Sequence, residues 1–524
     1  MSDVLSFDTD VLVVGGGMAG AWTALGAARE GAQVVLVDKG YCGTSGVTAT
    51  AGPGHWWVPP EQRAAVVAQR AQQGLGLADP AWMLRILDTT WRHLPTIASH
   101  YRFGVDAQGQ TVYRALRGPE YMRALRALVE AAGVRVLDHH PALELLRHDD
   151  GSVAGAAGQQ RRTGRVWSAR AGAVVLASGG CAFLSKLLGA DNNTGDGLLM
   201  AAELGAELSG MEFTNGYTVA PVYSSMTRAM SYVFARYFDA SGRELDIPPG
   251  PGSTVALATA LQHGPVFCSL DRMPRDLREL LPTISPNVLP AFARRGIDPF
   301  HDRFEIALRG EGTVRGIGGL RVASEACETT VPNLFVAGDT ASREAVAGAV
   351  SGGGNVNSAW ALSSGLWAGQ GAARRARQAG RRLRHAAQGA GQAGLRPQRA
   401  GVAPDTATAL ARLQRPMLDP ALNLFRHGAA LARSQRDLDS DWADWRAHAG
   451  GDATQALRHR EMAALLATAR WSLASALART ESRGMHLRTD APATLPTFAH
   501  PIHAGGLDRV WTRAPAPTPQ ALPA

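Results

Sequence analysis

The sequence predicts an α/β fold that opens with a Rossmann-like unit and closes with helices. Three observations support this. A short apolar strand, a glycine-rich turn, a helix and a second strand follow one another near the N-terminus, mixed segments fill the middle of the chain, and residues 404–480 alternate Leu and Ala with charged residues at helical spacing. The 524 residues, 45% of them hydrophobic, suffice for about three domains, which excludes a disordered or fibrous protein.

The N-terminal unit predicts a dinucleotide site. An apolar run at 11–14 is followed at once by GGGMAG at 15–20, which fits GxGxxG, then by a helix-like stretch and a second strand that ends at Asp38. The glycines allow a tight turn and a close approach to a pyrophosphate, and the helix N-terminus offers free N–H groups. Asp38 stands where an acid accepts hydrogen bonds from ribose hydroxyls. NAD and FAD both use this unit, so it leaves the two cofactors open.

Charge and cysteine content exclude other classes. The formal net charge is +8, and residues 371–524 carry 22 Arg against 11 acids, so the excess belongs to the C-terminal part. The Arg run at 371–400 has no aromatic interleaving, so we predict no nucleic-acid partner and leave open either a docking surface for an acidic protein or a solvated connector. The four cysteines form no CxxC pair and predict neither a metal site nor an internal iron–sulfur cluster.

The N-terminal residues predict neither a secretory signal nor a membrane span. The first ten residues contain acids where a secretory signal needs basic residues, and the apolar run after them is broken by glycines. We therefore expect no membrane span and a cytoplasmic protein. The last residues, 513–524, are rich in proline, which predicts a disordered tail.

Further motifs follow one another along most of the chain. They are Asp-Lys at 38–39, TSGVTATAGPG at 44–54, VVLASGG at 174–180, NTGDGLLM at 193–200, NLFVAGD at 333–339, Asn-Ser at 357–358 and ESRGMHLRTD at 481–490. In this order they resemble the flavoprotein family of succinate dehydrogenase, fumarate reductase, L-aspartate oxidase and adenylylsulfate reductase. The resemblance implies FAD rather than NAD as the cofactor.

The resemblance also implies the domains and the contacts with FAD. The expected fold is α/β, with a Rossmann-like FAD-binding domain at 1–216 and 316–370, an inserted α+β capping domain at 217–315, an Arg-rich connector and helical domain at 371–495, and a C-terminal extension at 496–524. The family's histidine for covalent attachment falls near Gly46, and the loop 44–54 holds no His, so FAD is expected to be non-covalent. The residues expected to contact FAD are Gly15, Gly17, Met18, Ala19, Gly20, Asp38, Lys39, Thr44, Ser45, Thr50, Ala51, Gly52, Ala142, Ala177, Ser178, Gly179, Asp196, Asp339, Asn357 and Ser358.

The family's dicarboxylate enzymes use two histidines and two arginines, and this chain departs from them at all four positions. Tyr217 stands at the first histidine and Val314 at the second. Gly353 stands at the carboxylate-binding arginine, and no Arg precedes the Gly-Pro-Val at 264–266 where the proton-shuttling arginine is expected. These departures predict a small substrate other than succinate, fumarate or aspartate.

Three residues are candidate catalytic groups. Tyr217 replaces a catalytic histidine and would donate a proton, or else is an aromatic core residue. His55 directly follows the flavin loop and would donate a proton beside Trp56 and Trp57, or else packs with them in the core. Arg315 would place a positive charge near the flavin N1–C2 region, where reduced flavin becomes anionic, or else lies on the surface.

These observations predict an FAD-dependent oxidoreductase that moves hydride between a small non-dicarboxylate substrate and flavin N5. Because the chain has no cluster of its own, its electrons would pass to a separate iron–sulfur or ferredoxin-like partner, or to oxygen. The alternative is an electron-transfer or assembly subunit without an organic substrate of its own. Association of the chain into a homo-oligomer stays open.

Overall fold

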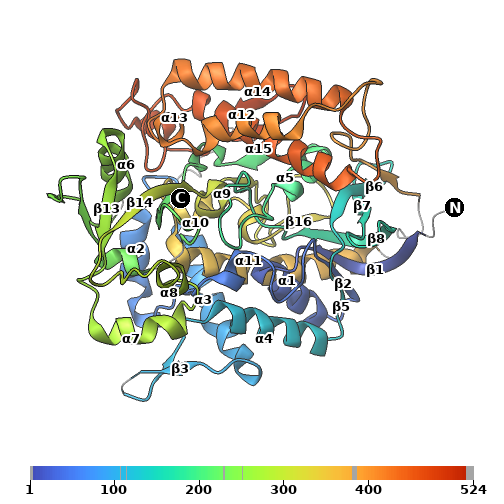
Figure 1. Cartoon of the computed structure of the whole chain (residues 1–524). Coiled ribbons are helices and arrows are strands. Elements are labelled where there is room, and N and C mark those ends of the chain that lie inside the picture. Colours follow the sequence, from blue (N-terminus) through green and yellow to red (C-terminus); the bar gives the residue numbers. More distant parts are fainter. Residues whose placement is uncertain are drawn as a thin grey trace, which may run out of the picture.

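The structure is a computed structural model that describes residues 4–106, 108–113, 115–227, 230–250, 252–379 and 386–514. Its largest sheet has eight strands within these residues, and a parallel group of them forms the centre (Figure 1). In spatial order the strands are β17 (Gln388–Gly389), β6 (Ala142–Arg147), β7 (Val153–Gln159), β8 (Val166–Leu176), β1 (Leu5–Val14), β2 (Val34–Val37) and β5 (Arg135–Leu137), with β16 (Leu334–Val336) also paired to β8.

Two helices pack tightly against each other beside this sheet, α1 (Met18–Arg29) and α11 (Gly353–Ala379) (Figure 1). Their contact needs small residues. A Cβ at Gly369 would lie 2.1 Å from the carbonyl oxygen of Thr23, and one at Gly26 would lie 2.8 Å from that of Leu366. Glycines therefore let the two backbones approach, and this approach fixes the position of the α1 N-terminus over the carboxyl ends of the central strands.

A second, antiparallel sheet has its own core. Its strands are β10 (Tyr217–Pro221), β14 (Phe304–Gly310), β13 (Val266–Ser269), β11 (Arg236–Phe238) and β12 (Glu244–Leu245). The helices α6 (Ser253–His263), α7 (Arg275–Ile284) and α8 (Leu289–Ala293) lie with it, at the left of Figure 1. Phe292 and Phe304 meet edge to face in this core, with ring centroids 4.7 Å apart. Every described strand of this sheet falls inside the expected capping segment.

The C-terminal helices stack on one another at the top of Figure 1. They are α12 (Thr406–Leu418), α13 (Pro420–Asn423), α14 (Gly428–His448) and α15 (Ala456–Ala478). α15 is buried along most of its length, and Trp471 on it is fully buried, as are Trp442 and Trp445 of α14. No helix among the described residues is both long enough and apolar enough to cross a bilayer.

Three of the described arginines of the run 371–400 pair with acids of the N-terminal part, and Arg375 donates to Asn333. Arg374 and Arg377 of α11 lie 3.8 and 3.1 Å from carboxylate oxygens of Glu30, and Arg396 lies 2.8 Å from Glu144. These pairs favour the connector interpretation for this part of the run, while residues 380–385 lie outside the described residues. α11 also continues through the expected domain boundary at residue 370.

The chain end adds to a small sheet. β18 (His503–Gly505) and β19 (Trp511–Arg513) extend a sheet formed with β9 (Leu208–Ser209) and β15 (Gly319–Leu320). Arg513, the first residue of the expected disordered tail, thus ends a strand. The rest of that expectation concerns residues 515–524, which lie outside the described residues.

Candidate functional site

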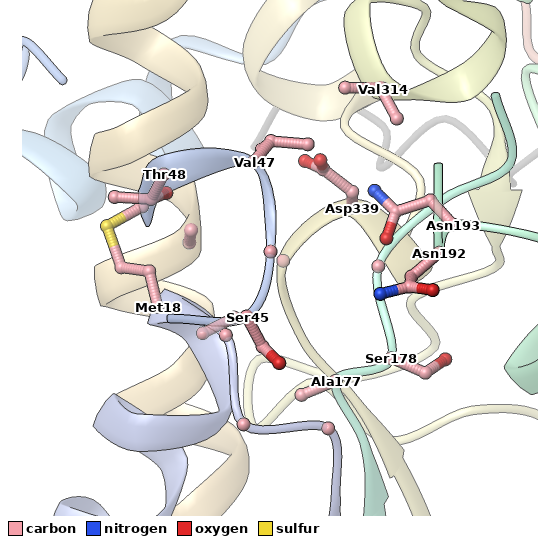
Figure 2. Close-up of a pocket in the computed structure, with 18 of the residues that line it drawn as sticks. Met18, Ser45, Val47, Thr48, Ala177, Ser178, Asn192, Asn193, Val314 and Asp339 are labelled. Carbon is pink, nitrogen blue, oxygen red and sulfur yellow. The ribbon is translucent and has the colours of Figure 1, made fainter. Parts of the chain in front are cut away.

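A cavity of about 350 Å³ lies at the carboxyl ends of β1, β2 and β8, the position at which open α/β sheets bind ligands. Segments far apart in the sequence line it. Figure 2 shows Val314 and Val47 at the top of this space and Ser45 and Ala177 at the bottom, with Asp339 pointing into it. The cavity lining is therefore assembled from distant parts of the chain.

The glycine-rich turn forms one wall of the cavity. Gly15 has φ +112°, and a Cβ there would lie 2.3 Å from the carbonyl oxygen of Ala177. Gly17 caps α1 without any side-chain hydrogen bond, and the first turn of α1 carries no acid. The free N–H groups of this helix end therefore face the cavity wall without a competing carboxylate, which fits the pyrophosphate of a dinucleotide.

Asp38 fits the ribose of the same dinucleotide. It directly follows β2, is 6% exposed, and accepts a hydrogen bond on Oδ1 from the N–H of Gly40 at 3.1 Å. Its Oδ2 is buried and has no hydrogen-bond partner among the described residues. Burial raises the pKa of Asp38. A ribose hydroxyl would supply the missing donor.

Lys39 also lines the cavity, but its ammonium group is already paired. It donates to Thr194 Oγ1 at 2.8 Å, to Asp196 Oδ2 at 2.7 Å and to Glu461 Oε1 at 2.9 Å. These contacts tie the end of β2 to the start of α5 (Asp196–Ala202) and to α15. Lys39 thus holds three elements together around the cavity, with its charge compensated by two carboxylates.

A buried arginine positions the other end of the cavity. Arg343 is 1% exposed and pairs with Asp339, which follows β16. It also donates to the carbonyl oxygens of Thr313 at 2.9 Å and Val314 at 3.1 Å, and to that of Gly316. The short helix α9 (Gly312–Arg315) is thereby fixed against the strand that carries Asp339.

Seventeen of the twenty residues expected to contact FAD line this cavity; Gly20, Thr44 and Thr50 do not. Gly20 lies behind the turn, Thr44 bonds the carbonyl oxygen of Tyr41, and Thr50 bonds that of Leu188. For these three, contact with FAD stays a prediction without support from the lining.

Several lining residues were missed by the sequence reasoning. Most are neighbours of motif residues, so the motifs themselves held the signal. Pro141 had no such signal, because it lies between β5 and β6 outside every motif. The missed residues include Gly16, Val47, Thr48, Pro53, Gly54, Pro141, Asn192, Asn193, Met200, Gly338, Gly354 and Ala361.

Of the three candidate catalytic residues, Arg315 lines the cavity and the other two do not. Tyr217 is 6% exposed and packs with Ala258 and Leu424, and burial raises its pKa. His55 is 1% exposed, its Nε2 lies 3.4 Å from the Tyr121 hydroxyl, and burial lowers its pKa to about 3. In this arrangement His55 is neutral at physiological pH and packs in the core.

The sequence matches known flavoproteins. Residues 82–222 match the family described as FAD binding domain, residues 10–113 that described as FAD dependent oxidoreductase, and residues 411–502 that described as fumarate reductase flavoprotein C-term. The chain is 26% identical to one subunit of the fumarate reductase (CoM/CoB) of Methanothermobacter marburgensis, and the alignment covers 95% of this chain and 97% of that protein. It is 29% identical to L-aspartate oxidase of Mycobacterium tuberculosis, with 95% of each protein covered. These matches bear out the resemblance of the chain to the flavoproteins of fumarate reductase and L-aspartate oxidase. The chain is an FAD-dependent oxidoreductase, as the sequence predicted.

Solved structures share the fold of this flavoprotein. A variant of E. coli quinol fumarate reductase FrdA matches with a TM-score of 0.81 at 21% identity, over 99% of this chain and 98% of that chain. Adenylylsulfate reductase of Archaeoglobus fulgidus matches with a TM-score of 0.76 at 18% identity, over 98% of this chain and 96% of that chain. The predicted α/β class with a Rossmann-like FAD-binding domain is confirmed, and the flavoprotein families confirm FAD as the cofactor.

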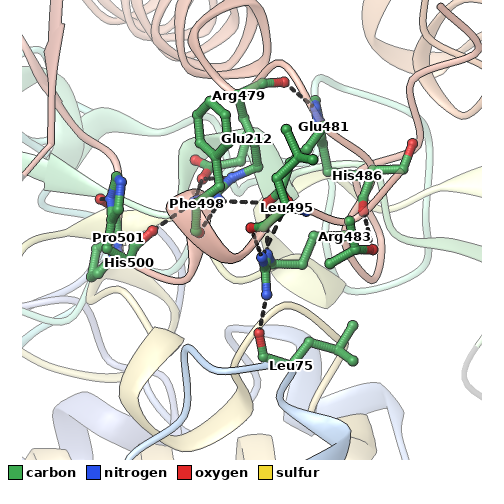
Figure 3. Close-up of polar contacts among 12 residues, drawn as sticks. Leu75, Glu212, Arg479, Glu481, Arg483, His486, Leu495, Phe498, His500 and Pro501 are labelled. Atoms are coloured by element: carbon green, nitrogen blue, oxygen red, sulfur yellow. Dashed lines mark hydrogen bonds and ion pairs between the residues drawn. The ribbon is translucent and has the colours of Figure 1, made fainter. Parts of the chain in front are cut away.

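A buried polar network of the flavoprotein joins Glu212 to residues 479–500 of the C-terminal part (Figure 3). Arg479 donates from Nε to Glu212 Oε1 at 2.8 Å and from Nη1 to Glu481 Oε1 at 3.0 Å, and all three side chains are fully buried. Glu344, 5% exposed, accepts a hydrogen bond from the Ser209 hydroxyl at 2.6 Å. Burial, and next the charge of Glu212, raise the pKa of Glu344 to about 8.

Glu344→Gln is expected to flatten the dependence of stability on pH. The pKa of Glu344 rises from 4.5 to about 8 on folding, so between these values the folded protein binds more protons than the unfolded chain. The free energy of unfolding therefore falls as pH rises through this window, by at most about 1.4 kcal/mol per pH unit from this group. Urea unfolding of the wild type and the variant at pH 6 and pH 8 measures this change. From pH 6 to pH 8 the free energy of unfolding of the wild type should fall by about 2 kcal/mol more than that of the variant. Parallel losses in the two proteins would contradict this.

Proposed function

We propose that this oxidoreductase transfers hydride between a small organic substrate that is not a dicarboxylate and N5 of a non-covalently bound flavin. The observation that carries the proposal is a contrast within one site. Most of the predicted FAD contacts line the cavity, whereas the positions expected to clamp a dicarboxylate hold Val314, Gly353 and Tyr217, which does not line the cavity. The family's cofactor site is kept and its substrate clamp is absent from those positions.

The chain's own part in the reaction is binding and orientation. FAD, when bound, supplies the two-electron chemistry. The N–H groups at the start of α1 would hold its diphosphate, and Asp38 Oδ2 would accept a ribose hydroxyl. Arg315 would keep a positive charge in the site, which favours negative charge that develops there during the reaction.

The charges on the cavity lining argue against two carboxylates. Each carboxylate that leaves water needs a cationic or strong hydrogen-bonding partner. Lys39 and Arg315 are the cations on the described lining, and the ammonium of Lys39 is engaged by Asp196 and Glu461. Among the described lining residues, one cation, Arg315, therefore remains for a substrate.

The electrons would leave to a separate iron–sulfur or ferredoxin-like protein, or to oxygen. One relative is named as one subunit of a fumarate reductase, which supports a partner chain. The second candidate is a protein that relays electrons without an organic substrate of its own. It is favoured by Gly353 and Gly354, where an added Cβ would meet no atom within 4 Å, so this side of the cavity is open.

The test is anaerobic bleaching of the yellow FAD-loaded protein. We expect succinate and L-aspartate to leave the visible flavin absorbance unchanged. We expect fumarate to fail to reoxidise the dithionite-reduced protein. A substrate without two carboxylates should change the visible flavin absorbance. Turnover of succinate, fumarate or L-aspartate would refute the substrate proposal. Bleaching by a reduced ferredoxin, with no response to any metabolite, would favour the second candidate.

A further inference from the structure

Arg315 is held at the cavity by contacts that the family motifs do not include. Its Nε lies 3.6 Å from Glu311 Oε2, one turn earlier in the chain, and its side chain is 23% exposed. Glu311 is fully buried, and its other oxygen accepts a hydrogen bond from the Thr218 hydroxyl of β10. Its N–H donates to the carbonyl oxygen of Gly216 at 2.8 Å.

These contacts fix one side of the guanidinium and leave the other available. Among the described residues Arg315 pairs with Glu311, through Nε, and its Nη1 and Nη2 donate no hydrogen bond there. The neighbouring cation, Arg343, is engaged through Nη1 and Nη2 by Asp339 and three carbonyl oxygens. A guanidinium with two parallel N–H donors is the geometry that binds one carboxylate through both oxygens.

We propose that Arg315 binds a single carboxylate of the substrate, so that the substrates are monocarboxylates. This inference rests on the proposed function and names its substrate class. Glu311 is a positioning residue, since it holds Arg315 Nε and is itself held by Thr218. On the described lining a second carboxylate would face Val314 and the open side at Gly354 without a further unpaired cation, and its lost hydration would not be compensated there.

The site is assembled from both sheets of the protein. Thr218 belongs to β10 of the antiparallel sheet, whereas Arg343, which fixes α9, follows β16 of the central sheet. An added Cβ at Gly216 would lie 2.8 Å from the Cβ of Arg315, so the chain before β10 presses directly on the base of this side chain. The anchor therefore depends on the contact between the two sheets.

The test uses the FAD-loaded full chain and the change in its flavin absorbance on titration with butanoate, crotonate or benzoate. Crotonamide is the uncharged control and fumarate the dicarboxylate control. We expect a monocarboxylate to bind, crotonamide at least about 10-fold more weakly, and fumarate more weakly than crotonate. Arg315→Lys should raise the Kd for crotonate about 10-fold and Arg315→Met about 100-fold, with the Kd for crotonamide unchanged.

Matched variants separate anchoring from structure. Arg309→Met removes an arginine of β14 that donates to the Val222 carbonyl and does not line the cavity, and it should leave the Kd for crotonate unchanged. Glu311→Gln should raise that Kd several-fold and leave the flavin content unchanged. Arg315→Lys keeps the positive charge. If Arg315→Met binds FAD poorly, the Kd for crotonate of Arg315→Lys tests the inference in its place.

Three results would overturn the inference. They are no binding of any of the three monocarboxylates to the wild type, an unchanged Kd for crotonate in both Arg315 variants, or a shift of the flavin reduction potential in Arg315→Met with carboxylate affinity retained. The third result would show that the positive charge of Arg315 acts on the reduced flavin and not on a substrate carboxylate. If one of these three results is found and a neutral metabolite still bleaches the flavin, the inference about Arg315 fails but the proposed function does not. Turnover of a dicarboxylate would instead overturn the proposed function itself.

Discussion

Gly20→Ala is expected to destabilise the protein by about 3 kcal/mol or more and to abolish FAD binding. An added Cβ at Gly20 would lie 1.8 Å from the carbonyl oxygen of Gly15, closer than any non-bonded contact. The obstacle is backbone, and Gly15 is itself held at φ +112° against Ala177. The start of α1 must therefore move away from the turn, which displaces the N–H groups that would hold the diphosphate.

Two glycine variants are controls for this prediction. Gly17 has open space around an added Cβ and an ordinary φ, so Gly17→Ala should leave the stability of the apoprotein unchanged. The same variant should weaken FAD binding, because Gly17 lines the cavity. Gly104→Ala, on the exposed strand β3 (Gly104–Val105), should change neither. Urea unfolding of apoprotein and FAD titration measure the two effects. A Gly20→Ala apoprotein as stable as the wild type would refute the argument.

The N-terminal unit was predictable because its signals are local. The apolar run at 11–14, the glycines and Asp38 lie in sequence order and form β1, the turn and the end of β2. The boundaries were less accurate: β1 begins at Leu5, because its first half, LSFDTD, pairs with β8 although it alternates polar residues. That pairing joins segments some 160 residues apart, and no local pattern contains it.

The candidate catalytic residues show where sequence reasoning stops. Motif position placed Tyr217, His55 and Arg315 near the flavin, but packing decides which side chain reaches the cavity. His55 turns toward Tyr121, and Tyr217 packs against Leu424 of the C-terminal part. Arg315 reaches the lining because Arg343 fixes the carbonyl groups around it. Such contacts between distant segments have no counterpart in the local sequence.

Arg479→Met is expected to cost about 3–5 kcal/mol of folding stability, because it leaves a buried carboxylate without its partner. Glu212 and Glu481 are both fully buried against Arg479 (Figure 3). Glu481 keeps Arg483, whose Nε lies 2.6 Å from its Oε1, whereas Glu212 loses its side-chain ion pair. The carbonyl oxygens of Phe498 and His500, at 2.8 and 2.9 Å from Arg479, would lose their donors as well.

The loss should depend on pH and on Glu212. Burial already raises the pKa of Glu212, and removal of the Arg479 charge would raise it further. Protonation then relieves the unpaired charge at low pH, so the deficit of Arg479→Met should be smaller at pH 5 than at pH 8. The double variant Arg479→Met/Glu212→Gln should recover part of the loss by the same reasoning. Arg243→Met removes an arginine paired with Asp239 whose side chain is 78% exposed, and should cost less than about 1 kcal/mol. Equal costs for the buried and the exposed arginine in urea unfolding would show that the buried network around Arg479 does not stabilise the fold through its charges.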